Sequence, residues 1–320
     1  MLNIKPFVDQ AYTRIGQHIR KTPAEYAEKL SKDLGCEVFL KCENYQLTGS
    51  FKIRGAMNKI LGLSSKDLEK GVVTASTGNH AGAVAEALKV VNGRGIIYMP
   101  ENVSKTKVAQ LEGNLSLELR FEGNDSVVAE KKALEYANQS GAIWVSPYND
   151  YEVIAGQGTI GVELVEQIEA LDAVFVPVGG GGLISGIAGY MKAVNPAIEI
   201  VGCQPENSAV MSASIEAGEI LDLESKPTIS DGTAGGVEQG SITFDFCKAY
   251  VDSFCLVSED EIKSALSFII TNHNMIIEGA AGLALASLNK LHQNYTGKKV
   301  ALILCGNKLG AKQLVDLLPK

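Results

Sequence analysis

The sequence has few residues of the kinds that bind metal ions. Its four histidines and six cysteines, in 320 residues, form no HExxH or CxxC motif, which argues against a dedicated metal site or a redox-active cysteine pair. Scattered cysteines in a chain of this size are typical of reduced packing residues. We therefore predict a protein without a bound metal ion.

The sequence also lacks long apolar runs and an excess of basic residues. No stretch of 18 apolar residues occurs, and residues 1–7 lack the apolar segment of a signal peptide. We therefore expect a cytoplasmic protein that does not enter a membrane. The 37 acidic and 29 basic residues give a net charge of −8. Acidic proteins bind nucleic acids and anionic membranes poorly, so neither is an expected partner.

The composition and the order of apolar segments indicate the fold class. Hydrophobic residues make up 46% of the chain, and 320 residues exceed the usual size of a single core, so we expect two domains. Short apolar runs alternate with helical patterns, as in a strand over 173–178, a helix over 182–194 and a strand over 199–203. This alternation predicts an α/β protein whose parallel sheets are covered by helices on both faces.

A run of four glycines, Gly179 to Gly182, joins one of these strands to the next helix. Glycines let the backbone approach a ligand closely, and N–H groups at a helix start favour anions. The pattern predicts a phosphate site. A dinucleotide site stays open as an alternative, because Gly180, Gly182 and Gly186 loosely match its fingerprint and Glu206 follows at a suitable distance. Tight backbone packing is the third interpretation.

Two other turns also carry chemical groups. Lys52, within Ser50-Phe-Lys-Ile-Arg-Gly-Ala56, stands at a predicted helix start, where the helix dipole disfavours a cation. That position suits a lysine that is bonded covalently or acts as a neutral amine, with a solvated surface lysine as the ordinary alternative. The segment Ser76-Thr-Gly-Asn-His80 offers N–H, hydroxyl and amide donors suited to a carboxylate. A plain capping turn is its alternative.

These segments together resemble the fold type II pyridoxal-phosphate enzymes, in the serine/threonine dehydratase and serine racemase branch. Four further motifs carry the resemblance over nearly the whole chain: Lys21-Thr-Pro23, Lys41-Cys-Glu-Asn44, Ile154-Ala-Gly-Gln-Gly-Thr159 and Glu278-Gly-Ala-Ala-Gly282. The resemblance implies a tryptophan synthase beta-like fold and a homodimer. Residues 1–48 and 147–320 would form a large domain that binds the cofactor, and residues 49–146 a small inserted α/β domain.

The resemblance also implies roles for individual residues. Lys52 would carry pyridoxal 5'-phosphate as a Schiff base, and Phe51 would lie against the ring of the cofactor. The phosphate group would rest on the glycine run and the residue after it, namely Gly179, Gly180, Gly181, Gly182 and Leu183. Asn79 would bind the 3'-hydroxyl of the ring. The substrate carboxylate would be held by the turn that includes Ser76, Thr77, Asn79 and His80.

Two more residues would stand near the ring of the cofactor. Glu278 is one, with a solvated carboxylate at a helix start as the alternative. Cys305 would face the pyridine nitrogen, with a buried packing cysteine as the alternative. A thiol is a weak donor that cannot keep this nitrogen protonated, so rapid loss of a leaving group on the β-carbon is favoured over a long-lived carbanion.

The implied activity is that of an ammonia-lyase of amino-acid catabolism. It would convert L-threonine, L-serine or a related β-hydroxy amino acid, such as hydroxyaspartate, into a 2-oxo acid and ammonia by α,β-elimination. Lys52, as a neutral amine, would remove the α-proton, and the glycine-rich loop 231–240 of the irregular region 218–241 would shape the side-chain pocket. Two alternatives stay open. Thr77 places a hydroxyl where racemases of the branch carry serine, so a serine racemase with side dehydratase activity is one, and a non-catalytic binding protein is the other.

Overall fold

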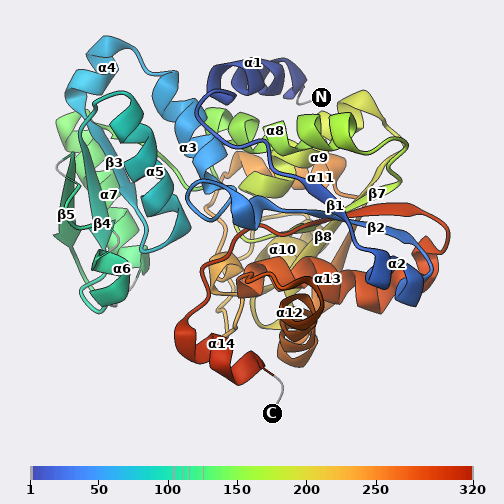
Figure 1. Cartoon of the computed structure of the whole chain (residues 1–320). Helices are drawn as coiled ribbons and strands as arrows, with labels where there is room; N and C mark the ends of the chain where they lie inside the picture. Colours follow the sequence, from blue (N-terminus) through green and yellow to red (C-terminus); the bar gives the residue numbers. More distant parts are fainter. Residues whose placement is uncertain (1–2, 104, 110, 115, 125, 319–320) are drawn as a thin grey trace.

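The molecule is built around two separate β-sheets that lie side by side (Figure 1). The computed structural model describes residues 3–318 except 104, 110, 115 and 125. The large sheet has the strand order β1-β2-β10-β7-β8-β9, and the small sheet has the order β5-β4-β3-β6. The strands of the large sheet are β1 (Ala24–Tyr26), β2 (Glu37–Lys41), β7 (Ala173–Pro177), β8 (Glu199–Pro205), β9 (Ser253–Val257) and β10 (Lys299–Ile303).

The strands of the small sheet all come from one stretch of the chain: β3 (Val72–Ala75), β4 (Gly95–Met99), β5 (Leu117–Phe121) and β6 (Ile143–Trp144). The helices that come before and within this stretch are α1 (Lys5–Ile15), α2 (Glu28–Leu34), α3 (Lys52–Leu61), α4 (Ser65–Lys70), α5 (Asn79–Val90), α6 (Lys105–Ala109) and α7 (Ser126–Ser140). The later helices are α8 (Tyr151–Gln167), α9 (Gly182–Val194), α10 (Val210–Ala217), α11 (Ile242–Tyr250), α12 (Glu259–His273), α13 (Gly279–Leu291) and α14 (Ala311–Leu317).

Helices cover both faces of the large sheet. In Figure 1, α8, α9 and α11 lie above this sheet, and α12 and α13 lie below it. Strand β7 is buried along its whole length, because its apolar side chains have a helical layer on either side. The expected α/β architecture with parallel sheets is thus confirmed. The edge strand β1 differs, because it pairs with β2 in the antiparallel direction.

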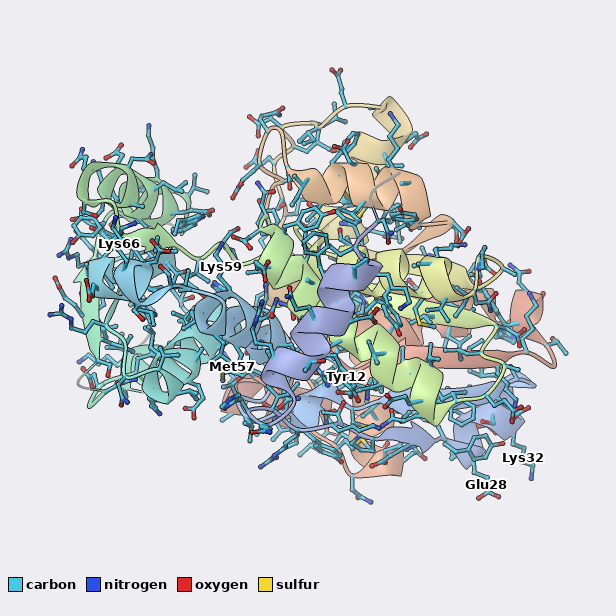
Figure 2. The ribbon with its side chains drawn as sticks, turned by 90° about the horizontal axis from the view of Figure 1, so that it is seen from above. Tyr12, Glu28, Lys32, Met57, Lys59 and Lys66 are labelled. Atoms are coloured by element: carbon cyan, nitrogen blue, oxygen red, sulfur yellow. The ribbon has the colours of Figure 1, made fainter. Side chains whose placement is uncertain are left out.

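The small sheet is packed between α7 on one side and α5 on the other, and α3 packs against α5 from behind. Helix α3 also packs on α8, which belongs to the part of the molecule built on the large sheet. It therefore stands at the junction between this large part and the half that contains the small sheet. Figure 2 shows Met57 and Lys59 of α3 in that position. One apolar cluster accordingly joins Met57 and Val84 to Val153 of α8. The division into domains at residues 49 and 146 stays a prediction.

A buried network of charges fixes α3 against the large part. The Arg54 guanidinium donates to both carboxylate oxygens of Glu43, at 2.8 and 2.7 Å, and to both oxygens of Glu163, at 2.6 and 2.9 Å. Lys41 forms the second cationic partner of Glu163, and Thr22 donates to Glu43. All of these side chains are fully buried. Because removal of one partner of such a buried pair costs about 3–5 kcal/mol, the network holds Lys52 and its helix in a fixed position.

The sequence pattern predicts a helix over 154–170, and helix α8 differs from this range at both ends. It begins at Tyr151, where the Asp150 side chain accepts hydrogen bonds from the N–H groups of Glu152 and Val153, and it ends at Gln167. The N-terminal shift follows from this capping residue, which satisfies the free N–H groups of the first turn. In the described part of the chain, no helix is both long enough and apolar enough to cross a lipid bilayer.

Candidate active site

Lys52 is the first residue of α3 and points toward the turn that leads from the small sheet back to the large one. Its Nζ atom donates a hydrogen bond to the Pro147 carbonyl at 2.8 Å and lies 5.2 Å from the centre of the Phe51 ring. Burial lowers the pKa of Lys52 to about 8, although Cys305 and Glu278 nearby partly oppose this shift. About one tenth of the amine is therefore neutral at pH 7, and the solvated-lysine interpretation is wrong.

The four glycines form the turn between β7 and the start of α9, and side chains crowd them. A Cβ atom on Gly180 would lie 2.6 Å from the ring of Tyr148, and one on Gly179 would lie 2.9 Å from the Cα atom of Thr233. Gly181 has a φ of +88°, a backbone conformation that favours glycine. The turn is thus a bare backbone cradle, and the N–H groups of the first turn of α9 have no partners within the helix. It fits an anion such as phosphate.

Asn79 and Glu278 meet from opposite halves of the molecule. The Asn79 side-chain amide donates to both oxygens of the Glu278 carboxylate, at 3.1 and 2.8 Å, while no donor among the described residues reaches its buried Oδ1 atom. Glu278 is 4% exposed, so the alternative of a solvated carboxylate is wrong. Burial raises the pKa of Glu278. The unpaired amide oxygen is free to accept a hydrogen bond from a hydroxyl group on a bound ring.

Cys305 follows β10, one of the two central strands of the large sheet, and its thiol lies 3.7 Å from Glu278 Oε1. Burial holds the pKa of Cys305 well above its ordinary value. The thiol therefore keeps its proton and acts as a weak donor. This contact places Cys305 beside the other candidate residues, and the nearby charge of Lys52 affects it electrostatically. Its predicted contact with a ring nitrogen stays a prediction.

The turn from Ser76 to His80 joins β3 to α5. Ser76 Oγ accepts from the Gly78 N–H at 3.2 Å, and Thr77 and Gly78 line a cavity of about 450 Å³ between the two halves. The buried His80 ring is hydrogen-bonded to the Val145 carbonyl at 3.0 Å. Burial lowers the pKa of His80 to about 3. The ring is therefore uncharged, and the predicted carboxylate site would consist of the N–H groups at the start of α5, including that of His80.

These residues fit pyridoxal phosphate. The turns bring together the partly neutral amine of Lys52, the backbone cradle of the glycine run, the unpaired amide oxygen of Asn79 and the protonated thiol of Cys305. The sequence interpretation did not include Tyr148, whose ring forms one wall of the cradle and whose hydroxyl accepts from the Glu238 N–H at 3.1 Å. No motif marks Tyr148, because its contact depends on how the chain crosses between the two halves.

The described residues include no group of three or more histidine, cysteine, aspartate or glutamate side chains arranged to hold a metal ion. The predicted lack of a metal in the natural protein stays a prediction.

Comparison with known proteins gives consistent results. A family model described as pyridoxal-phosphate dependent enzyme matches residues 15–306. The L-threonine ammonia-lyase of Thermotoga maritima is 40% identical over 314 residues, which are 98% of this chain and 77% of that protein. The catabolic L-threonine dehydratase of Escherichia coli strain K12 is 39% identical over 96% of this chain and 94% of that protein. The crystal structure of serine racemase from Dictyostelium discoideum has a TM-score of 0.88 at 35% identity, covering 95% of this chain and 98% of the other.

Proposed function

The chain belongs to the family of pyridoxal-phosphate dependent enzymes, and we propose that Lys52 is the residue to which the cofactor is bound. The protein is an ammonia-lyase of the serine and threonine dehydratase group, which converts a β-hydroxy amino acid into a 2-oxo acid and ammonia. The single observation that carries the assignment of the site is the convergence of three groups, which are the half-buried Lys52 amine, the unpaired amide oxygen of Asn79 and the glycine cradle.

Each residue of the site has a separate task in this reaction. Pyridoxal phosphate, when bound, withdraws electrons from the α-carbon of the substrate and so makes the α-proton acidic. The Lys52 Nζ atom accepts that proton, which requires the neutral amine that burial favours. The N–H groups at the start of α5 hold the substrate carboxylate in place. Cys305 would donate a hydrogen bond to the ring nitrogen and keep its proton, because burial holds the pKa of the thiol high.

The remaining groups would hold the cofactor. Its phosphate would rest on the residues of the β7–α9 turn, namely Gly179, Gly180, Gly181, Gly182 and Leu183. Asn79 Oδ1 would accept from the ring hydroxyl, and Phe51, next to Lys52, would lie against the ring. Glu278 orients Asn79 through two hydrogen bonds, so it acts through Asn79. The backbone of the cradle is held in place by Thr243, whose Oγ1 atom donates a hydrogen bond to the Gly180 carbonyl at 2.7 Å.

Racemisation is the second activity that the site supports, and one residue carries it. Thr77 places a hydroxyl on the turn that holds the substrate carboxylate, and it lines the cavity between the two halves. A hydroxyl that returns a proton to the opposite face of the α-carbon would invert it. We expect Thr77→Ala to leave dehydration largely intact and to abolish any formation of D-serine.

A panel of amino acids tests the proposed function. The enzyme loaded with pyridoxal phosphate is incubated with L- and D-threonine, L- and D-serine and the hydroxyaspartates, and 2-oxo acid, ammonia and chirality are measured. We expect 2-oxo acid and ammonia in equal amounts from an L-amino acid, and neither from Lys52→Ala. The matched control is Lys70→Ala, because Lys70 is an exposed lysine paired with Asp67. Turnover by Lys52→Ala would disprove the assignment of Lys52.

We also propose a homodimer located in the cytoplasm. The cytoplasmic location is supported by the cysteines, since all six are free and buried, as expected of a protein from a reducing compartment. The homodimer is supported by the family resemblance and by large apolar side chains that are exposed on the single chain, including Tyr26 and Leu47.

A further inference from the structure

The cavity between the two halves has a volume of about 450 Å³ and adjoins the turn that precedes α5. Its wall on the side of the large sheet includes Thr48 and Lys308, and its wall on the side of the small sheet includes Thr77 and Asn114. A cavity of this volume is large enough for a small-molecule ligand. Because Thr77 belongs to the turn proposed to hold the substrate carboxylate, the cavity is continuous with the candidate active site.

Lys308 enters this cavity from the loop after β10. Its backbone N–H donates to Glu278 Oε2 at 3.3 Å, which fixes it beside the carboxylate that orients Asn79. Its side chain extends to the first turn of α5, since a Cβ atom on Gly82 would lie 3.5 Å from Lys308 Nζ. In the part of the chain that the structure describes, no carboxylate pairs with this half-buried amine. A bound anion would supply the missing partner, because half-buried cations are normally paired.

Two uncharged polar groups of the cavity wall also lack partners. The Thr48 hydroxyl oxygen and the Asn114 side-chain nitrogen are buried, and neither has a hydrogen-bond partner among the described residues. The other end of the Asn114 amide is fixed, because its Oδ1 atom accepts from the Ser116 N–H at 3.0 Å. Buried donors without an acceptor are rare in folded proteins. A ligand with several acceptor oxygens would satisfy both groups.

The charged side chains of the cavity favour an anionic ligand. The lining includes Lys89, Lys107 and Lys308, as well as Glu86 and Glu112. Lys89 and Glu86 compensate each other at 2.9 Å, and Glu112 is exposed to solvent. Burial lowers the pKa of Lys308, and the charge of Lys107 contributes to this shift. An anionic group bound next to Lys308 would oppose both effects.

We propose that Lys308, together with Thr48 and Asn114, binds a second carboxylate on the substrate, so that the enzyme prefers β-hydroxy amino acids with an acidic side chain. The smallest of these is 3-hydroxyaspartate. The inference rests on the proposed ammonia-lyase activity and names its substrate class. The α-carboxylate lies on the N–H groups at the start of α5, and the side-chain carboxylate lies on Lys308, beside the first turn of the same helix.

The reaction is the same elimination as for the other β-hydroxy amino acids. The α-proton and the β-hydroxyl leave as water, and one water molecule then replaces the amino group, which leaves as ammonia. The products are a 2-oxo diacid and ammonia, and no oxidant or reductant is required. Only the group that occupies the cavity differs.

Threonine and serine offer no acceptor to the three groups of this cavity. Their side chains would leave the Lys308 amine, the Thr48 hydroxyl and the Asn114 amide without a ligand partner. A site built to hydrogen-bond a substrate group discriminates strongly against analogues that lack it, by up to about 10⁴-fold or more. Lys308 is only half-buried, so water can replace part of the lost interaction, and we expect a smaller preference.

The variant Lys308→Met tests this proposal, because it removes the charge and keeps a long, flexible side chain. Lys308→Arg keeps the charge and should retain part of the preference. The matched control is Lys70→Met, since Lys70 is an exposed lysine that pairs with Asp67. With enzyme loaded with pyridoxal phosphate, kcat and KM are measured for L-threo- and L-erythro-3-hydroxyaspartate, L-threonine and L-serine from the 2-oxo acid and ammonia formed.

We expect the natural protein and Lys70→Met to use one 3-hydroxyaspartate at least about tenfold better than L-threonine in kcat/KM. In Lys308→Met, kcat/KM for 3-hydroxyaspartate should fall by about tenfold or more, mainly through KM, while that for L-threonine stays within about twofold. An equal loss for both substrates would mean that Lys308 binds a group common to all of them and would overturn the proposal. The absence of a preference in the natural protein would overturn it as well.

A binding measurement separates this proposal from the proposed activity, because it requires no turnover. L-Aspartate carries the second carboxylate but no leaving group on its β-carbon, and L-alanine carries neither. By calorimetry, the natural protein loaded with pyridoxal phosphate should bind L-aspartate at least about tenfold more tightly than L-alanine, and Lys308→Met should bind the two equally. Should Lys308→Met not fold, Thr48→Val should reduce the preference for L-aspartate several-fold.

The two measurements together identify which proposal fails. A preference for L-aspartate without turnover of any β-hydroxy amino acid would contradict the proposed activity and support the acidic-ligand site. Turnover of L-threonine without a preference for L-aspartate would support the activity and overturn the role of Lys308.

Discussion

At the scale of the residue, Lys52 combines a poor position for a charge with a good position for a reaction. It stands at the positive end of α3 and is half-buried, and its amine donates a hydrogen bond to the neutral Pro147 carbonyl. Both effects disfavour the ammonium form. The nearest acidic groups, Cys305 and Glu278, keep their protons more readily than usual because of burial, so they compensate little of the charge.

This environment predicts an unusual pH dependence for the reaction of Lys52 with the cofactor. In protein freed of pyridoxal phosphate, the rate of covalent binding should rise by about tenfold per pH unit up to about pH 8 and level off above it, because the neutral fraction of Lys52 saturates there. An ordinary lysine would show the same rise up to about pH 10.4. The measurement follows the absorbance of the bound cofactor after mixing, with Lys52→Ala as the blank. A rise that continues unchanged to pH 10 would contradict the lowered pKa.

The residues of the site differ in how readily the sequence identifies them. Lys52, Asn79 and the four glycines lie in short motifs at the boundaries of strands and helices, where local sequence is informative. Tyr148 lies in no motif, and its role arises only because the chain crosses back to the large part beside the cradle. The orientation of the His80 ring depends on the Val145 carbonyl, 65 residues later in the chain, and no local pattern encodes such a contact.

At the scale of the element, the β7–α9 turn is a place where packing excludes any side chain. The Gly180→Ala substitution would put a Cβ atom 2.6 Å from the Tyr148 ring, so the ring or the turn must move. We expect the affinity for pyridoxal phosphate to fall by about tenfold or more, which corresponds to roughly 1.4 kcal/mol. Equilibrium titration of the cofactor measures it.

The control for this substitution is Gly236→Ala, since a Cβ atom on Gly236 would have no atom within 4 Å. That variant should bind the cofactor as the natural protein does. An unchanged affinity in Gly180→Ala would show that the cradle adapts to a methyl group, and the phosphate assignment would then lose its main structural support.

Elements with strong apolar patterns were the easiest to predict. Strand β7 and helix α9 correspond closely to their predicted ranges. Five consecutive apolar residues are typical of a buried strand, and the glycine run marks the start of the helix. The short edge strand β1 is largely exposed and has no such pattern. Its antiparallel pairing depends on the position of β2, which is information about the whole sheet and absent from three residues of sequence.

At the scale of the whole molecule, we expect two copies of the chain to associate. Light scattering coupled to size-exclusion chromatography should give a mass twice that of the 34.0 kDa chain at micromolar concentration. The physical reason is the exposed apolar surface of the single chain, including Tyr26 and Leu47, which association would remove from water. A mass of one chain that persists as the concentration is raised would contradict the expected homodimer.

The position of β10 within the large sheet has a consequence for synthesis on the ribosome. This strand, Lys299–Ile303, is inserted between β2 and β7, whereas the small sheet needs only residues 72–144. A growing polypeptide can therefore complete its small sheet early, while the exposed edges of β2 and β7 wait for nearly the last residues to emerge. Until then those edges are open to pairing with other nascent chains, so release of a product truncated before residue 299 should favour aggregation over a shortened enzyme.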